Sequence, residues 1–299
     1  MANKRSIVDA HHHLWDLQAC DYPWLMARGV QRFFGDPTPI QKNYLVADLL
    51  DDAQDYELAA SVHIQVGVAP GDELKESAWL QDTSDAQGLP SVLVPFCDLS
   101  DSNASLRLGA QRNYSNVRGV RQIIGRSDQE DAISGSGKLL DDPLWREHLS
   151  LLAELDLSFD LQMTPGQATT AAEVLAQAAS TKVAICHCGS PWDQSSAGLT
   201  SWRRGMRLLA ESPNVNCKIS GLGMFDHDWT VESIRPIVES CIEIFGAERC
   251  MFGSNFPVDK LHASYQRIWQ AFETICAGMS TAEQDQLFGG TAREFYRIA

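Results

Sequence analysis

Eight short apolar runs, most of them followed by a stretch with helical spacing, recur along the whole chain and constrain its fold more than any other feature. The runs cover residues 7–13, 60–66, 91–97, 117–124, 157–163, 182–188, 214–220 and 249–254. Their nearly continuous apolar character is typical of parallel strands that are buried on both faces. Helical patterns lie at residues 45–56, 142–155, 169–179, 231–245 and 261–277, and from residue 281 onward.

Eight strand-and-helix units in 299 residues predict a (βα)8 barrel, or TIM barrel, that occupies residues 1–299 as a single domain. The main alternative is a doubly wound open sheet, which uses the same alternation. No Gly-x-Gly-x-x-Gly motif follows the first run, which removes the commonest reason to prefer that alternative. Residues 16–43 lack a clear period and contain Trp24, Phe33 and Phe34, so we expect a long functional loop after the first strand.

The composition narrows the class of partner. Hydrophobic residues make up 44% of the chain and charged residues 21%, which is typical of a soluble globular protein. The formal net charge of −15 disfavours nucleic acid and anionic membranes, and no run approaches the ~18 apolar residues of a membrane span. The eight cysteines lie mostly in apolar runs, where buried thiols behave as small hydrophobes. We therefore expect a cytoplasmic protein with reduced thiols and a small-molecule partner; a homo-oligomer remains open.

Two histidines at the end of the first apolar run are the first candidates for chemistry. Catalytic groups of a barrel lie at the carboxyl ends of its strands, and residues two apart on a strand face the same side. His11 and His13 should therefore form an inward row with Asp9, while His12 points outward. Two imidazoles on one wall make half of a divalent-metal site. An isolated His-x-His pair is, however, more often structural.

His187 strengthens the functional interpretation of that pair. It ends the sixth apolar run, flanked by Cys186 and Cys188. If His187 faces the barrel axis, the two cysteines should face the helices. The rival interpretation makes the cysteines metal ligands, but the Cys-x2-Cys spacing of most zinc sites is absent. The predicted metal ligands, if any metal is bound, are His11, His13 and His187.

Further polar residues end other apolar runs. They are Gln65, Arg121, Gln162, Lys218 and Asn255. Charged side chains are seldom buried without a partner, so Arg121 and Lys218 should reach a polar site. A cation placed there could stabilise the negative oxygen that develops when a carbonyl is attacked. The alternative is a structural ion pair, for instance between Lys218 and Asp160.

The order and content of these segments resemble a known family. The chain has DAHHHLW at residues 9–15, DYPWL at 21–25, GVR at 119–121, HCGSP at 187–191, KISG at 218–221 and MFGSNFPV at 251–258. Taken together, these motifs resemble the amidohydrolase superfamily. They are most similar to its TIM-barrel lactone hydrolases, the branch with L-fuconolactonase, L-rhamnonolactonase and 2-pyrone-4,6-dicarboxylate lactonase. The resemblance covers essentially the whole chain.

The resemblance implies hydrolysis of a lactone in a site formed by His11, His13, His187 and the residue that ends the eighth strand. In much of the superfamily that last residue is an aspartate that binds metal or activates water, whereas this chain has Asn255. His187 is then the predicted general base, and Asp259 is the open alternative. Loss of a carboxylate weakens any metal site, and the branch includes members that work without metal. We expect either no required cofactor or one weakly held, zinc-like divalent ion.

The predicted reaction is attack of water on the carbonyl of a lactone, with the lactone of a sugar acid as the favoured substrate. His187 handles the proton, Arg121 or Lys218 stabilises the oxyanion, and Asn255 completes the catalytic set. The residues expected to bind the ring are Trp15, Trp24, Gln65 and Gln162. A sugar lactone is favoured over a dicarboxylate, since Arg121 and Lys218 are the cations placed at strand ends, with Arg118 and Arg126 uncertain.

Two other functions remain open. One is metal-dependent decarboxylation of a small aromatic acid on the same barrel, against which Asn255 argues, because that reaction usually needs an aspartate at this position. The other is a relative that binds a ligand without catalysis, which Asn255 favours and the three histidines oppose.

Overall fold

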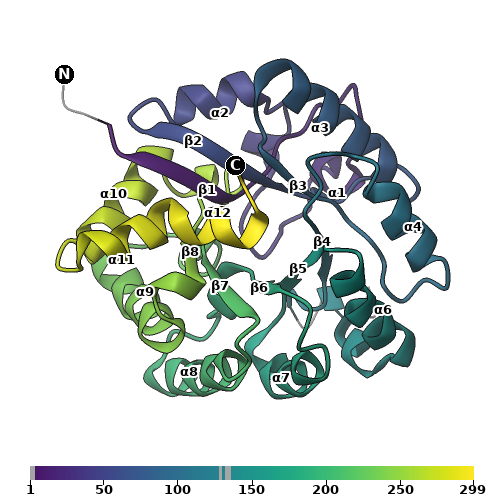
Figure 1. The fold of residues 1–299 in the computed structure, drawn as a ribbon. Coiled ribbons are helices and arrows are strands. Elements are labelled where there is room, and N and C mark those ends of the chain that lie inside the picture. The colour runs from purple at the N-terminus through teal and green to yellow at the C-terminus, as the bar shows by residue number, and fades with distance from the viewer. Residues whose placement is uncertain (1–3, 128–129, 132–135) are drawn as a thin grey trace.

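The strands follow one another around a barrel in the computed structural model, which describes residues 4–127, 130–131 and 136–299 (Figure 1). These residues form β1 (Ser6–His12), β2 (Glu57–Ile64), β3 (Val92–Val94), β4 (Gly119–Ile123), β5 (Ser158–Gln162), β6 (Val183–Ile185), β7 (Val215–Ile219) and β8 (Cys250–Phe252). One parallel ladder joins β1 to β3 and another joins β4 to β8. Parallel bridges link the two ladders, pairing Leu93 with Val117 and Phe96 with Arg121.

Backbone hydrogen bonds between the first and last strands close the barrel. The amide of Asn255 donates to the carbonyl of His11 at 2.7 Å, and the amide of His13 donates to that of Phe256 at 2.7 Å. An open doubly wound sheet would leave these two strands as separate edges. The predicted (βα)8 barrel is confirmed.

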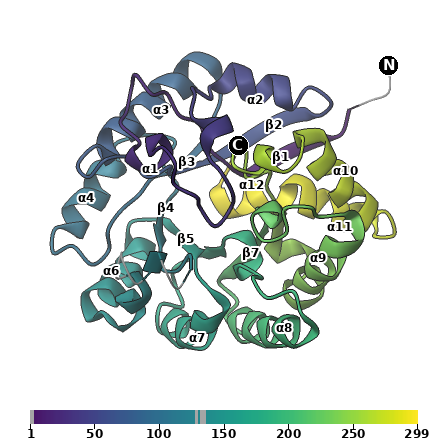
Figure 2. The same ribbon diagram turned by 180° about the vertical axis from the view of Figure 1, so that it is seen from behind.

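Helices surround the strands (Figures 1 and 2). The main ones are α2 (Val46–Asp52), α3 (Glu73–Gln87), α4 (Ala104–Gln111), α6 (Pro143–Glu154), α7 (Ala168–Gln177), α8 (Ser196–Ala210), α9 (Val231–Phe245) and α10 (Tyr265–Cys276). The sequence patterns predicted α2, α6, α7, α9 and α10 but not α3, α4 or α8. The helix α3 was not predicted because much of its buried face is polar, so it lacks the apolar spacing of an amphipathic helix. The buried polar residues are Glu76, Ser77, Gln81 and Ser84.

Shorter helical elements complete the chain. The long loop after β1 contains α1 (Pro23–Met26) and the 3-10 helix η1 (Thr38–Ile40), and the chain ends with α11 (Thr281–Asp285), the π-helical turn η8 (Gln286–Gly290) and α12 (Thr291–Tyr296). Further 3-10 turns are η2 (Ser136–Asp141), η3 (Pro165–Gln167), η4 (His187–Gly189), η5 (Leu222–Met224), η6 (Ala247–Arg249) and η7 (Asp259–Leu261). Among the helices described, none combines the length and the apolar character needed to cross a bilayer.

Small apolar side chains and α12 form a second core, which we call the barrel floor. It contains Val8, Ala10, Ala60, Val62, Ile64, Val92, Val94, Ala184, Met251, Ala292, Phe295 and Tyr296. In Figure 1, α12 lies across the middle of the ring of strands. The cavity described below is lined from the carboxyl ends of the strands, so α12 covers the opposite end.

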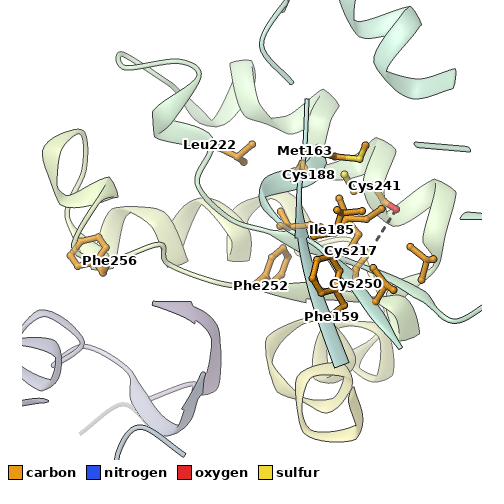
Figure 3. Packing of buried hydrophobic residues seen from close by; sticks show 14 of the residues in the cluster. Phe159, Met163, Ile185, Cys188, Cys217, Leu222, Cys241, Cys250, Phe252 and Phe256 are labelled. Atoms are coloured by element: carbon orange, nitrogen blue, oxygen red, sulfur yellow. Dashed lines mark hydrogen bonds between the residues drawn. The ribbon is translucent and has the colours of Figure 1, made fainter. Parts of the chain in front are cut away.

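The larger core lies between the strands and the helices. Figure 3 shows part of it, where Phe159, Ile185, Cys217 and Phe252 pack together. All eight cysteines are buried and free, and the Cys250 thiol donates to the carbonyl of Cys241 at 3.4 Å. The expectation of buried, unpaired thiols is confirmed.

Candidate active site

A cavity of about 250 Å³ opens at the carboxyl ends of the strands. Its volume is slightly below the range of ~300–1,000 Å³ that is usual for ligand pockets, and it therefore suits a small molecule. Eight of the ten residues predicted to catalyse the reaction or to bind the ring or a metal line it, namely His13, Trp15, Trp24, Gln65, Arg121, Gln162, His187 and Asn255. Two others, His11 and Lys218, do not line the cavity, and their surroundings are described below.

An irregularity in β1 decides which of its polar residues face the barrel axis. Asp9 pairs with Ser61 and His12 with His63, so β1 has one residue more than β2 over this step. Such a bulge reverses the side on which the following residues lie. The ring of His11 therefore contacts that of His187, with centroids 4.3 Å apart.

The same bulge corrects the prediction for Asp9, which does not share an inward row with the histidines. Its carboxylate instead accepts from Ser254, 2.6 Å from the Ser254 hydroxyl, and from the hydroxyl of Tyr265 in α10 at 3.1 Å. Burial raises the pKa of Asp9 to about 6, against the lowering effect of these hydrogen bonds. His12 packs edge-on against His63 with centroids 5.9 Å apart and does not line the cavity.

A turn with left-handed backbone brings His187 into the cavity. The strand β6 ends at Ile185, and His187, Cys188 and Ser190 have φ values of 53°, 55° and 59°. Successive side chains here no longer alternate between the barrel axis and the helices as they do in a regular strand. The prediction that Cys186 faces the helices is therefore wrong. Its thiol lies with the ligand atoms of His11 and Asp160, all within 4.8 Å of one another. Cys188 packs in the larger core between the strands and the helices, as predicted.

Arg121 and the neighbouring imidazoles form the centre of the site. Arg121 is 6% exposed, and its Nη1 lies 3.5 Å from Nε2 of His11. Nδ1 of His187 lies 2.9 Å from the hydroxyl of Ser220. Burial lowers the pKa of His187 well below its usual range, and the charges of Arg121 and Lys218 lower it further. The pKa of His11 is also lowered well below its usual range, by burial first and then by His187. These imidazoles are thus neutral near pH 7.

Asn255 joins Asp259 to His13. Its Nδ2 donates to Oδ1 of Asp259 at 3.0 Å, and its Oδ1 lies 3.3 Å from Nε2 of His13. Nδ1 of His13 lies 2.8 Å from the carbonyl of Ile64, which can only accept, so Nδ1 carries a hydrogen. In a neutral His13, Nε2 would then carry no hydrogen, and two acceptors, Nε2 and Oδ1 of Asn255, would face each other.

Two proton arrangements relieve that conflict. In one, His13 is an imidazolium. In the other, the Asn255 amide is turned over and a protonated Asp259 donates to it, since the oxygen and nitrogen of an amide are assigned from their partners. Burial raises the pKa of Asp259 to about 7 and lowers that of His13 well below its usual range. These shifts favour the proton on Asp259, which is 3% exposed behind Asn255.

Lys218 lies deeper in the barrel, and the structure favours the alternative role considered for it. Its ammonium lies 2.5 Å from Oδ2 of Asp160, and both side chains are 0% exposed. The Tyr296 hydroxyl lies 2.8 and 3.0 Å from the two oxygens of the same carboxylate. Lys218 thereby ties β7 to β5, and through Tyr296 to α12, without reaching the cavity.

Aromatic residues of the loop after β1 form one wall of the cavity. Trp24 stands edge-on to Trp15 and to Phe34, with centroids 6.5 and 6.0 Å apart. The indole nitrogens of Trp15 and Trp24 donate to the carbonyls of Lys42 and Val66, each at 2.6 Å, and so fix both rings. The sequence predicted Trp15 and Trp24 as wall residues, and their positions agree with that role.

The cavity also contains charged residues that the sequence analysis did not assign to it. Arg32 comes from the loop after β1, and Arg126 and Glu130 follow β4. Arg126 was an uncertain candidate, whereas Arg118 donates to the backbone carbonyls of Ser115 and Val117 instead. Loop residues carry no periodic signal, so composition alone could have suggested them, as where Arg32 directly precedes Phe33 and Phe34.

A metal ion is the cofactor that the fold family implies, and the residues fit it poorly as they are arranged. Among the described residues, the ligand atoms that converge belong to His11, Asp160 and Cys186, a different set from the predicted His11, His13 and His187. The carboxylate of Asp160 is already paired with Lys218, and burial raises the pKa of Cys186 to about 12, so its thiol keeps its proton. A cation would also meet the charge of Arg121.

Comparison with known proteins agrees with the fold. The family profile described as amidohydrolase matches residues 8–298. An uncharacterized protein of Sinorhizobium fredii, y4mH, is 40% identical over 98% of this chain and 99% of its own. An L-fucono-1,5-lactonase of Burkholderia multivorans is 27% identical over 97% and 96% of the two chains. A zinc-bound amidohydrolase structure from Burkholderia multivorans has a TM-score of 0.84 at 26% identity, covering 98% and 99%. The chain therefore belongs to the amidohydrolase family.

Proposed function

We propose that this protein hydrolyses a lactone, the cyclic ester of a sugar acid. The observation that carries the proposal is the position of Arg121, a buried guanidinium with no carboxylate within 4.0 Å among the described residues, at the cavity that His187 lines. A cation held beside a neutral imidazole suits a reaction in which a carbonyl oxygen becomes negative while water loses a proton. Similarity to an L-fucono-1,5-lactonase supports the same reaction class.

The reaction begins with attack of water on the ring carbonyl. The water oxygen forms a bond to the carbonyl carbon, His187 takes the proton, and Arg121 stabilises the resulting oxyanion. When the tetrahedral intermediate collapses, the bond from carbon to the ring oxygen breaks, and the proton passes from His187 to the departing alkoxide. The product is an open hydroxy acid, which ionises at neutral pH.

Hydrogen bonding prepares His187 for this task. If Nδ1 donates to the Ser220 hydroxyl, the other ring nitrogen, Nε2, is free to accept a proton. Because the pKa of His187 is lowered, the imidazole is unprotonated throughout the neutral range. A base with a lowered pKa abstracts protons less readily, and the oxyanion contact of Arg121 offsets this.

The remaining cavity residues suit a ring that carries hydroxyl groups. The Oε1 atom of Gln65 is buried and has no hydrogen-bond partner among the described residues, so a substrate hydroxyl can donate to it. Gln162 is the last residue of β5 and lines the same cavity. Trp15 and Trp24, whose rings stand edge-on to each other, provide an apolar wall for the carbon face of the substrate ring.

The proposed reaction has no step through a metal. A zinc-like ion would have to displace Lys218 from Asp160 and deprotonate Cys186, so we expect it to be held weakly if it binds. The zinc-bound relative makes this expectation worth testing. Metal-dependent decarboxylation gains no support from the site, because a carboxamide stands at the end of β8 and Asp259 lies behind it.

A screen with a pH indicator tests the proposal, because opening a lactone at neutral pH releases one proton. Purified protein should acidify a weakly buffered solution of sugar lactones faster than an equal amount of the His187→Ala variant does. Equal rates for the two proteins on every lactone would refute the assignment of His187. A complete panel without enzymatic acidification would refute lactone hydrolysis.

A further inference from the structure

Three arginine side chains converge on the cavity. Arg32 comes from the loop after β1, Arg121 from the middle of β4, and Arg126 from the loop that follows it. Burial lowers the pKa of Arg121, and among its neighbours Arg126 adds to that lowering. Burial likewise lowers the pKa of Arg126, and Arg32 adds to it. Because all three arginines line one cavity of about 250 Å³, each lies within electrostatic reach of the next.

Few acidic side chains balance these cations. Within the described part of the chain, Glu130 is the carboxylate that lines the cavity, and it lies 3.9 Å from Nε of Arg126. Asp131 accepts from the backbone amide of Arg126 rather than from its guanidinium. Arg32 and Arg121 lie in no ion pair with a described carboxylate. A protein of net charge −15 thus concentrates positive charge at its candidate active site.

Two of the guanidinium groups also have unused donors. Nε of Arg32 and Nε of Arg121 are buried, and neither has a hydrogen-bond partner among the described residues. Arg32 uses Nη2 to donate to the carbonyl of Trp24 at 3.2 Å, and its guanidinium lies 5.9 Å from the Trp24 ring centre. Buried donors without acceptors cost free energy that a ligand with anionic oxygens would recover. The planar guanidinium is well suited to a carboxylate.

We propose that the substrate lactone carries a carboxylate apart from its ring ester, and that Arg32 and Arg126 bind this group while Arg121 faces the ring carbonyl. This inference rests on the proposed lactone hydrolysis and names its substrate class as the monolactone of a dicarboxylic sugar acid. It adds one carboxylate to the sugar lactone that the sequence favoured. The sequence disfavoured a dicarboxylate because Arg121 and Lys218 were the cations placed at strand ends, with Arg118 and Arg126 uncertain.

A matched pair of substrates tests the inference. D-Gluconolactone ends in a hydroxymethyl group, and D-glucarolactone of the same ring size has a carboxylate in its place. We expect kcat/KM to be at least about 10-fold higher for D-glucarolactone, the gain typical of a charge-assisted hydrogen bond. The advantage should shrink as salt is raised, because the contact is electrostatic. Equal rates, or a preference for D-gluconolactone, would overturn the inference and leave lactone hydrolysis intact.

Variants of the two outer arginines locate the effect. Arg32→Gln and Arg126→Gln should each lower the ratio of kcat/KM for D-glucarolactone over D-gluconolactone about 10-fold, chiefly through KM. Arg28→Gln is the matched control, since Arg28 is exposed in the same loop and lies outside the cavity; its ratio should equal that of the unmodified protein. If Arg32→Gln and Arg126→Gln leave the ratio unchanged, the carboxylate is not bound here.

A binding measurement separates the two proposals. If the protein hydrolyses neither lactone, calorimetry with the open dianion D-glucarate and the monoanion D-gluconate still reports on the arginines. Tighter binding of D-glucarate that Arg32→Gln abolishes would support the anion site while lactone hydrolysis fails. Equal binding of the two acids would overturn the anion site as well.

Discussion

Replacing Lys218 with methionine separates a structural role of this side chain from a catalytic one. Methionine keeps the apolar stem but removes the ammonium that lies 2.5 Å from Asp160, where both side chains are fully buried. The Asp160 carboxylate then keeps Tyr296 as its hydrogen-bond donor but loses its counter-charge. Removing one partner of a buried ion pair typically costs about 3–5 kcal/mol in the free energy of unfolding.

Thermal unfolding followed by circular dichroism measures the effect. At roughly 2–4 °C per kcal/mol for a chain of this size, Lys218→Met should lower Tm by on the order of 10 °C. Lys182→Met is the matched control, because Lys182 is exposed just before β6, and its Tm should stay within about 2 °C. The double variant Lys218→Met, Asp160→Asn should recover part of the loss, since no unpaired buried charge remains.

Activity of the same variants decides between the two roles. At a temperature where Lys218→Met is folded, we expect kcat/KM to change less than about 10-fold, because Lys218 does not line the cavity. Loss of the charge also raises the pKa of His187, which Lys218 helps to lower. An unchanged Tm together with a loss of activity of about 10²-fold or more would refute this reasoning and make Lys218 the oxyanion cation.

Four further predictions concern the site. Arg121→Ala should lower kcat/KM about 10²–10³-fold with folding retained, the usual effect of losing one oxyanion donor; a variant that fails to fold would show a structural role instead. Asn255→Ala should be impaired but active on the lactone that His187→Ala fails to turn over, and near-native turnover by His187→Ala would shift the base to Asp259. A base is active when deprotonated, so with His187 in that role kcat/KM should stay level from pH 8 to 6.5 and fall only below, whereas a limb near pH 7 would indicate Asp259, whose pKa is raised to about 7. Metal analysis before and after chelation should find little or no zinc and unchanged activity; stoichiometric metal with activity abolished by chelation would contradict this.

The fold was predictable because its signal is repeated along the chain. Each strand is a short run of apolar residues, so errors of up to three residues at its ends did not alter the number or order of strands. The errors lie where the chain leaves the sheet. β6 was predicted as residues 182–188 and spans Val183–Ile185, because the polar residues that follow belong to the turn that carries His187.

The site was predictable to the extent that its residues sit on strands. His13, Arg121 and Gln162 were found because each is a polar residue in or directly after an apolar run, and all three line the cavity. The orientations of Asp9 and Cys186 were not predictable. They depend on a one-residue bulge in β1 and a left-handed turn after β6, and neither feature alters the hydrophobic periodicity of the sequence. The same limit applied to loop residues.

Arg32 illustrates that limit best. It lies in a segment without periodicity, and its role depends on two other arginines that come close only when the barrel has formed. The sequence analysis considered Lys218 as a cation of the site instead. A lysine within a strand gives the same sequence pattern whether its ammonium faces a ligand or an aspartate. The distance of 2.5 Å between the Lys218 ammonium and Asp160 shows that it faces the aspartate.

The backbone hydrogen bonds between Asn255 and His11, and between His13 and Phe256, also bear on how the protein becomes functional during synthesis. Residues that line the cavity come from near both ends of the chain, the last of them Val258, so a nascent polypeptide cannot complete its binding site until residue 258 has left the ribosome. Fragments produced by proteolytic cleavage between β1 and β8 would regain activity only by reassociating. Enzyme activity in a refolding experiment would accordingly report the joining of the first and last strands, and secondary structure should recover before it.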